Sequence, residues 1–270
     1  MGKGTVRIRR PAVAGTFYPA SERELESAIA GYLEEALAAG GDEYSPPPKA
    51  LVVPHAGYIY SGAVAAMAYA RLLSLGGTIE RVVLLGPAHR VPVRAIATSN
   101  AEAFETPLGQ VRLDRRGLDQ ALELDQVEVD DQAHTLEHSL EVHLPFLQTV
   151  LGHFLLLPFA VGDATDEEVA ELLELLWGGP ETLILISSDL SHHYDYDTAR
   201  QMDAATTQAI REMEPGVLGR ESACGRVPLR GFLVEARHQG LRCQVLDVRN
   251  SGDTAGSRDS VVGYGSYAFF

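Results

Sequence analysis

No apolar run in the 270-residue sequence approaches the roughly 20 residues that a membrane-spanning helix needs. The beginning of the chain also lacks the apolar segment of a secretory signal peptide. Cysteine is scarce: the sequence contains Cys224 and Cys243, and two cysteines cannot form a disulfide framework. We therefore expect a cytoplasmic protein whose thiols are both free.

Positive charge is also scarce. The sequence has 22 basic residues against 37 acidic ones, which gives a formal net charge of -15. An acidic surface repels phosphate backbones, and no basic stretch is interleaved with aromatic residues, so we do not expect nucleic acid as a partner. The G-x-S-x-G, P-loop and G-x-G-x-x-G motifs are missing too, which removes the usual signals of a serine hydrolase or a nucleotide-binding protein.

The composition that remains is that of an ordinary globular protein, with 46% hydrophobic and 22% charged residues. No linker divides the chain, so we predict a single domain over residues 1–270. Apolar strand-like segments alternate with segments of helical periodicity, which is typical of a layered α/β fold. Pro158 lies inside one predicted strand, which favours an edge strand or a bulge there. The predicted strands are 50–53, 81–85, 154–161, 182–187, 241–248 and 261–269, and the predicted helices are 22–39, 61–75, 115–124, 166–177, 197–213 and 228–238.

Polar, titratable side chains follow three of these predicted strands. His55 follows the first, His89 follows the second, and Asp189 and His192 follow the strand 182–187. Ligands of open α/β sheets bind at the carboxyl ends of the strands, so these residues are expected to meet in one cleft. Neutral imidazole is a good ligand for iron, copper and zinc. The pattern therefore predicts a metal site.

A second group of histidines lies in residues 134–151. His134, His138 and Glu141 are spaced by four and three residues, which places them on one face of a helix, and His143 follows closely. This spacing leaves open whether they surround the metal site or form a separate face. Leu136, Leu140, Leu144 and Leu147 are expected to form the core stripe of the same segment.

Cys224 lies among small residues in a predicted loop. A thiol in such a position can ligate a soft metal, act as a nucleophile, or be a small buried side chain. Cys243 lies in a strand pattern and is expected in the core.

Six motifs, taken in order, resemble the Memo family, and specifically its prokaryotic branch, called AmmeMemoRadiSam system protein B. The resemblance runs from about residue 8 to 268, nearly the whole chain. The motifs are Pro54-His55-Ala56-Gly57-Tyr58, Leu85-Gly86-Pro87-Ala88-His89, Thr106-Pro107-Leu108, Glu137-His138-Ser139-Leu140-Glu141-Val142-His143-Leu144-Pro145, Ser187-Ser188-Asp189 with His192, and Cys224-Gly225-Arg226.

This resemblance implies an α/β fold similar to that of class III extradiol dioxygenases, with a central mixed β-sheet and helices on both faces. It implies His55, His89 and Cys224 as ligands of an iron or copper ion, with zinc less expected. Asp189 and His192 would line the same cleft as catalytic groups. It also implies a radical-SAM protein and an AMMECR-type protein as partners. Glu141, His138 and His143 would surround the ligands.

Ring-cleaving dioxygenases hold Fe(II) with two histidines and a carboxylate, whereas the third implied ligand here is a thiol, which favours copper. Three functions therefore stay open. The first is a metal-dependent redox protein in which His192 moves a proton. The second is a non-catalytic partner of the radical-SAM and AMMECR-type proteins. The third is a zinc hydrolase with Asp189 or Glu141 as the base.

Overall fold

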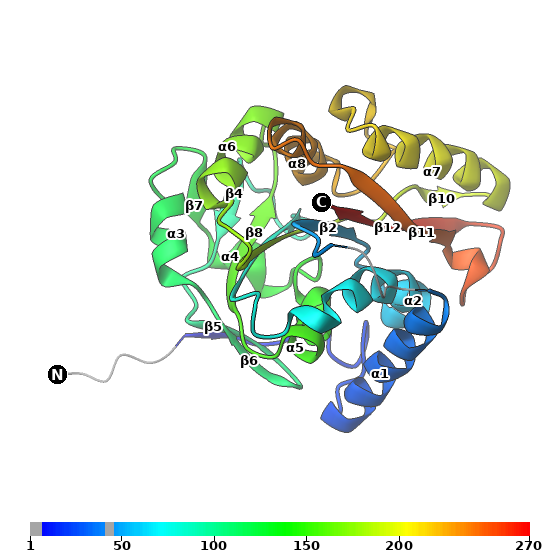
Figure 1. Ribbon diagram of the computed structural model, residues 1–270, viewed down its shortest axis with the longest axis horizontal. Coiled ribbons are helices and arrows are strands. Elements are labelled where there is room, and N and C mark those ends of the chain that lie inside the picture. Colours follow the sequence, from blue (N-terminus) through cyan, green and yellow to red (C-terminus); the bar gives the residue numbers. More distant parts are fainter. Residues whose placement is uncertain (1–6, 41–45) are drawn as a thin grey trace.

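The computed structural model describes residues 7–40 and 46–270, and its centre is a large twisted sheet (Figure 1). Within the described residues, nine strands form this sheet in the order β10-β12-β2-β9-β3-β8-β4-β7, with β11 pairing alongside β12. The strands are β2 (Ala50–Val53), β3 (Arg81–Pro87), β4 (Ile96–Thr98), β7 (Val127–Val129), β8 (Leu155–Val161), β9 (Thr182–Ser187), β10 (His192–Tyr194), β11 (Cys243–Asn250) and β12 (Val261–Phe269).

The sheet is mixed. Strands β2, β9, β3 and β8 run parallel, while β12 is antiparallel to β2 and to β11, and β4 is antiparallel to β8. The parallel strands are covered on both faces, and this is why they are nearly continuous apolar runs in the sequence. The predicted strands 50–53, 182–187 and 261–269 match the observed bounds.

Helices cover both faces of the sheet (Figure 1). On one face α1, α2 and α5 pack together, and on the other α8 packs against α6 and against strands β3 and β9. Helix α7 lies over β11, β12 and β10. The predicted α/β architecture is thus confirmed. The helices are α1 (Glu22–Ala38), α2 (Tyr58–Tyr69), α3 (Arg115–Ala121), α4 (Asp131–Thr135), α5 (Leu144–Leu151), α6 (Asp166–Leu176), α7 (Tyr196–Arg211) and α8 (Arg226–His238).

Shorter elements complete the chain. Strands β1 (Ile8–Arg9), β5 (Ala103–Thr106) and β6 (Gly109–Arg112) form a separate small sheet, and four segments of the described ranges are 3-10 helices: Ala70–Leu75, Glu141–His143, Pro215–Val217 and Ser251–Asp253. The proline-containing sequence of residues 42–48 predicts a surface loop, and this segment falls largely outside the described ranges. No helix among the described residues is long and apolar enough to span a bilayer.

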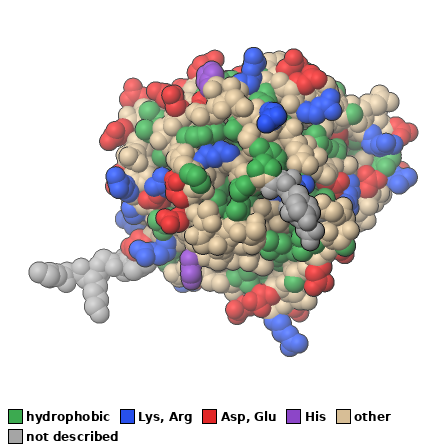
Figure 2. Space-filling view, viewed as in Figure 1, with side chains coloured by type: hydrophobic (Ala, Val, Ile, Leu, Met, Phe, Trp, Pro, Cys, Tyr) green, Lys and Arg blue, Asp and Glu red, His purple; other side chains and the backbone are tan. Residues whose placement is uncertain are grey.

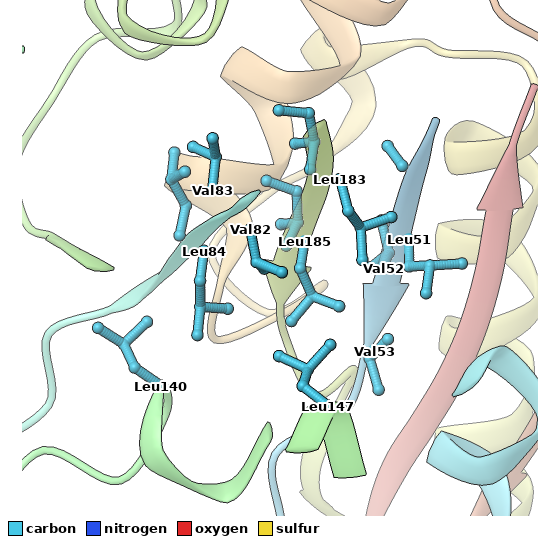
Figure 3. Close-up of a cluster of buried hydrophobic side chains, with 14 of the residues drawn as sticks. Leu51, Val52, Val53, Val82, Val83, Leu84, Leu140, Leu147, Leu183 and Leu185 are labelled. Atoms are coloured by element: carbon cyan, nitrogen blue, oxygen red, sulfur yellow. The ribbon is translucent and has the colours of Figure 1, made fainter. Parts of the chain in front are cut away.

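Apolar side chains from the central strands form the core between the layers. Figure 3 shows Leu51 and Val53 of β2, Val82 of β3, Leu185 of β9 and Leu147 of α5 as members of one buried cluster. All of these side chains are buried. On the face seen in Figure 2, acidic side chains gather mostly toward the rim, and some hydrophobic side chains lie exposed nearer the middle.

The prediction that Pro158 marks an edge strand or a bulge is wrong. Strand β8 lies between β3 and β4, and its register with β3 is regular through Pro158. The carbonyl of Pro158 points away from β3 and accepts a hydrogen bond from Thr98 Oγ1. Because β4 pairs with β8 only at Ala160 and Val161, the missing N–H of the proline falls where the ladder with β4 has already ended.

The prediction of one helical face for His134, His138 and Glu141 is also wrong. Helix α4 ends at Thr135, His138 lies in a loop, and Glu141 begins a 3-10 helix. Leu136, expected in the core stripe, is 61% exposed because it follows the end of α4. The cause is a turn at residues 137–139, where the carboxylate of Glu137 accepts the backbone N–H groups of His138 and Ser139.

Glu141 is fully buried and binds the N-terminal segment. Its carboxylate forms an ion pair with Arg9 and accepts hydrogen bonds from Ala12 N (2.7 Å), Val13 N (3.0 Å) and Tyr18 Oη (2.5 Å). Burial raises the pKa of the Tyr18 hydroxyl, and the neighbouring Glu141 raises it further, so Tyr18 stays a donor. One carboxylate therefore fastens residues 9–18 to the loop that carries His138.

We expect Glu141→Ala to lower the free energy of unfolding by about 3–5 kcal/mol, because it leaves the Arg9 guanidinium buried without its partner. Urea denaturation followed by circular dichroism measures this. Glu105→Ala is the matched control, because the adjacent Arg10 pairs with Glu105 at the surface. The side chains of Arg10 and Glu105 are 75% and 23% exposed, against 6% and 0% for Arg9 and Glu141. Equally small effects of the two substitutions would contradict a structural role for the buried pair.

Candidate metal centre

Three imidazoles lie together at the carboxyl edge of the sheet. His55 follows β2, His89 follows β3, and His138 lies in the loop before the 3-10 helix Glu141–His143. One ring nitrogen of each lies within 4.8 Å of one ring nitrogen of the other two. The ring centroids are 5.2 Å apart for His55 and His89, 5.4 Å for His55 and His138, and 4.8 Å for His89 and His138. This group can hold a metal ion.

Strand order explains why distant residues meet here. Strand β9 lies between β2 and β3, and all three run parallel, so their carboxyl ends share one edge. His55 and His89 leave that edge from either side of Ser187, the last residue of β9. The His89 side chain is 28% exposed and that of His138 14%, whereas His55 is buried. The group therefore opens to solvent on the His89 side.

Hydrogen bonds fix the tautomer of His55. Ser187 Oγ donates its proton to the carbonyl of Ser139 at 2.6 Å, so at its 2.6 Å contact with His55 Nδ1 it accepts. The proton is thereby assigned to Nδ1, so Nε2 of His55 carries the lone pair, which faces the thiol of Cys224 at 3.3 Å. Burial lowers the pKa of His55 well below its ordinary value, and the nearby imidazoles lower it further. The ring is neutral, which is the form that binds metals.

Glu137 orients His89 in the same way. Its carboxylate accepts a hydrogen bond from His89 Nδ1 at 2.9 Å and another from the His89 backbone N–H. Burial raises the pKa of Glu137, but the hydrogen bonds from His89 and Ser139 outweigh burial and hold this pKa at about 2. An ionised carboxylate behind a histidine is the usual support of a metal ligand, and it leaves Nε2 of His89 free. Glu137 was not predicted as a site residue; its one signal in the sequence is its position directly before His138.

His138 was predicted to surround the ligands, and the structure places it within the group itself. Its ring stacks on His89 and contacts Phe17, with 4.7 Å between the centroids of His138 and Phe17. Burial lowers the pKa of His138 to about 4, so this ring is also neutral. Its Nδ1 is buried, lies 3.3 Å from Glu137 Oε1, and has no hydrogen-bond partner among the described residues. Buried polar atoms seldom lack partners, so the donor set fits a cation.

Cys224 lies beside this group. Its Sγ is 3.3 Å from His55 Nε2 and 3.3 Å from the backbone N of Asp189, whose N–H it accepts. The next residue has to be glycine, because a Cβ at Gly225 would lie 2.4 Å from the carbonyl oxygen of Ser187. Burial, followed by the charge of Asp189, raises the pKa of the thiol. The structure brings Cys224 within reach of the cluster, and its role as a ligand stays a prediction.

Asp189 and His192 are further titratable groups near the histidines. Asp189 Oδ1 accepts the backbone N–H of His55 at 2.7 Å, and burial raises the pKa of this carboxyl to about 7. His192 Nδ1 donates to the carbonyl of Leu190 at 2.8 Å, which leaves Nε2 free, and burial lowers the pKa of this ring. A carboxyl with a pKa near neutrality can gain or lose a proton under ordinary conditions.

Three other predicted residues have structural partners. Both carboxylate oxygens of Glu141 are taken up by the N-terminal segment, which leaves it unsuited to act as a base. His143 is buried, its Nδ1 lies 2.7 Å from Tyr69 Oη, and burial lowers its pKa to about 3. His134 Nε2 donates to the carbonyl of Ala97 at 3.0 Å. These residues hold the loops that carry the cluster.

The fold and the site together define an α/β protein with a mixed central sheet and a histidine group at its carboxyl edge that can hold a metal ion. The chain belongs to the Memo-like protein family, whose sequence profile matches residues 9–268.

Several curated relatives, each described as a MEMO1 family protein, match nearly the whole chain. The protein from Aquifex aeolicus is 37% identical over 271 residues, covering 96% of this chain and 98% of the relative. The proteins from Sulfolobus acidocaldarius and Ignicoccus hospitalis are 34% and 36% identical, each covering 97% of this chain and 99% and 98% of the relative. A crystal structure of an uncharacterised Escherichia coli K12 protein has a similar fold, with a TM-score of 0.58, 13% identity, and coverage of 81% of this chain and 98% of that one.

We expect Glu137→Gln to weaken metal affinity by about 10- to 100-fold. The amide has one accepting oxygen, and its NH2 group would face N–H donors of His89, His138 and Ser139. Competition for Zn²⁺ against a chromogenic chelator measures the affinity. Glu128→Gln, at an exposed position of β7, serves as the control and should bind as the wild type does. Unchanged affinity in Glu137→Gln would show that the carboxylate does not support the ligands.

Proposed function

We propose that the chain binds one iron or copper ion through His55, His89 and His138, with Cys224 as a fourth donor, and that the cleft carries out a redox reaction. The observation that carries this proposal is the meeting of three ring nitrogens within 4.8 Å of one another. Two of these histidines have their tautomers fixed by Ser187 and Glu137, so a lone pair on each is free toward a ligand. Such pre-organisation is expected of a ligand set.

The donor chemistry supports a transition metal rather than calcium or magnesium. Neutral imidazole suits iron, copper, nickel and zinc, and a thiol draws the preference toward softer ions such as copper. An iron or copper ion bound there supplies one-electron redox chemistry. Zinc is the weaker alternative, because copper outcompetes it at sites of this kind when both are available.

The chain's own residues would hold and move protons beside the ion. His192 offers a free Nε2 on a ring held by the Leu190 carbonyl. Asp189, whose carboxyl has a pKa raised to about 7, lies against the backbone of His55 and can hold a proton at its carboxyl oxygen. A carboxyl whose pKa is raised to about 7 and a histidine with a free Nε2 suit general acid–base work.

Metal content tests the proposal directly. We expect wild-type protein, purified without chelator or affinity tag, to contain close to one equivalent of iron or copper by elemental mass spectrometry. The double variant His55→Ala/His89→Ala should lose it, because it keeps one imidazole of the three. His153→Ala, at an exposed loop position, is the matched control and should retain the metal. Wild-type protein that takes up neither metal, even after reconstitution under reducing conditions, would overturn the proposal. Stoichiometric zinc in the purified protein would also overturn the redox function and would favour a hydrolase instead.

The role of His192 has a separate test. We expect His192→Ala to keep its metal but to consume oxygen about 100-fold more slowly with ascorbate as the reductant, because a positioned proton donor is lost. His193→Asn is the control: His193 is exposed and has a φ of 64°, a conformation that asparagine tolerates. Equal rates in wild type and His192→Ala, at equal metal content, would remove His192 from the reaction.

A further inference from the structure

A cavity of about 340 Å³ adjoins the metal centre on its Cys224 side. It lies between the loop after β3, the loop after β8 and the first turn of α8, and Cys224 forms part of its wall. The rest of the wall is mostly apolar, with Ala88, Val91 and Val227 among its residues. This volume is in the range of pockets that enclose small organic ligands.

One cation lines this cavity. Arg226, the first residue of α8, is partly buried, and its guanidinium forms no hydrogen bond or ion pair with any residue that the structure describes. On the same helix, by contrast, Arg230 is paired with Asp166 at 2.7 Å. A guanidinium that faces a cavity without a partner is a ready site for a carboxylate, which it binds through two parallel hydrogen bonds.

Asp163 also lines the cavity, but it does not neutralise Arg226. It forms no ion pair with Arg226 within 4.0 Å, and it is exposed, so water screens its charge. The cavity thus combines a half-buried cation, apolar walls and a rim acid.

We propose that this cavity is the substrate pocket of the proposed metal centre and that it takes a small carboxylate with an apolar body. The carboxylate binds Arg226, and the apolar body packs against Val91 and Val227, next to Cys224. That the bound molecule is a substrate rests on the proposed function. The binding of the carboxylate depends only on Arg226 and on the apolar walls of the cavity.

Binding measurements with known acids and their neutral amides test the pocket. We expect phenylacetate and hexanoate to bind wild-type protein at least tenfold more tightly than phenylacetamide and hexanamide, by isothermal titration calorimetry or ligand-observed NMR. Arg226→Met should weaken carboxylate binding at least tenfold and leave amide binding unchanged. This substitution removes no hydrogen bond between described residues, so folding should be preserved. Arg237→Met, at the exposed end of the same helix, is the control and should bind as the wild type does.

A second variant tests the walls without changing charge. Val91→Trp places a large ring into the cavity from a loop and should weaken carboxylate and amide alike. Carboxylates that bind no better than amides, or that bind Arg226→Met as well as wild type, would overturn the inference.

The same measurements separate this inference from the proposed function. Arg226→Met should keep the full metal content, and His55→Ala/His89→Ala, without metal, should still prefer carboxylates to amides. Metal without any carboxylate preference would overturn the pocket and leave the proposed function standing. Carboxylate preference in a protein that takes up no metal would support the pocket as an anion site and overturn the proposed function.

Discussion

The geometry of the centre depends on one buried carboxylate. Glu137 accepts hydrogen bonds from N–H groups of His89, His138 and Ser139. These bonds orient the ring of His89 and stabilise the turn that carries His138. The network continues from Ser139, because its carbonyl accepts a hydrogen bond from Ser187 Oγ. The same hydroxyl oxygen accepts a hydrogen bond from His55 Nδ1. All three imidazoles are therefore positioned by one connected set of hydrogen bonds, and in a buried network each bond reinforces its neighbours.

Two buried carboxyls that contact the histidine group have opposite properties. Several N–H donors hold the pKa of Glu137 at about 2, so it is a fixed negative charge. Asp189 has fewer donors to offset its burial, and its pKa rises to about 7. Groups whose environments move their pKa values apart serve different tasks. Here Glu137 gives permanent support, and Asp189, whose backbone N–H donates to Cys224, can exchange protons next to the cavity.

Much of the fold was predictable from the sequence, because buried parallel strands appear as continuous apolar runs. Strands such as 182–187 were therefore found with their bounds, and their polar ends pointed to the edge where His55 and His89 meet. Glu137 was missed because a loop residue that turns the chain leaves no periodic pattern. The partners of Glu141 could not be predicted either, since they are more than a hundred residues earlier in the chain. The prediction of an edge strand or bulge at Pro158 is wrong because the effect of a proline depends on where the neighbouring ladder ends. Only the strand register shows where that is.

The order of the strands also governs when the centre can form during synthesis. Strand β2, which leads into His55, lies between β9 and β12, and β12 ends one residue before the C-terminus. Neither neighbour of β2 exists until the chain has been made as far as residue 187, and the second, β12, follows only at residues 261–269. Contacts between such distant residues are slow to form. His55 is thus translated early, but the strand that leads into it gains its two neighbours only after residues 187 and 269 have been made.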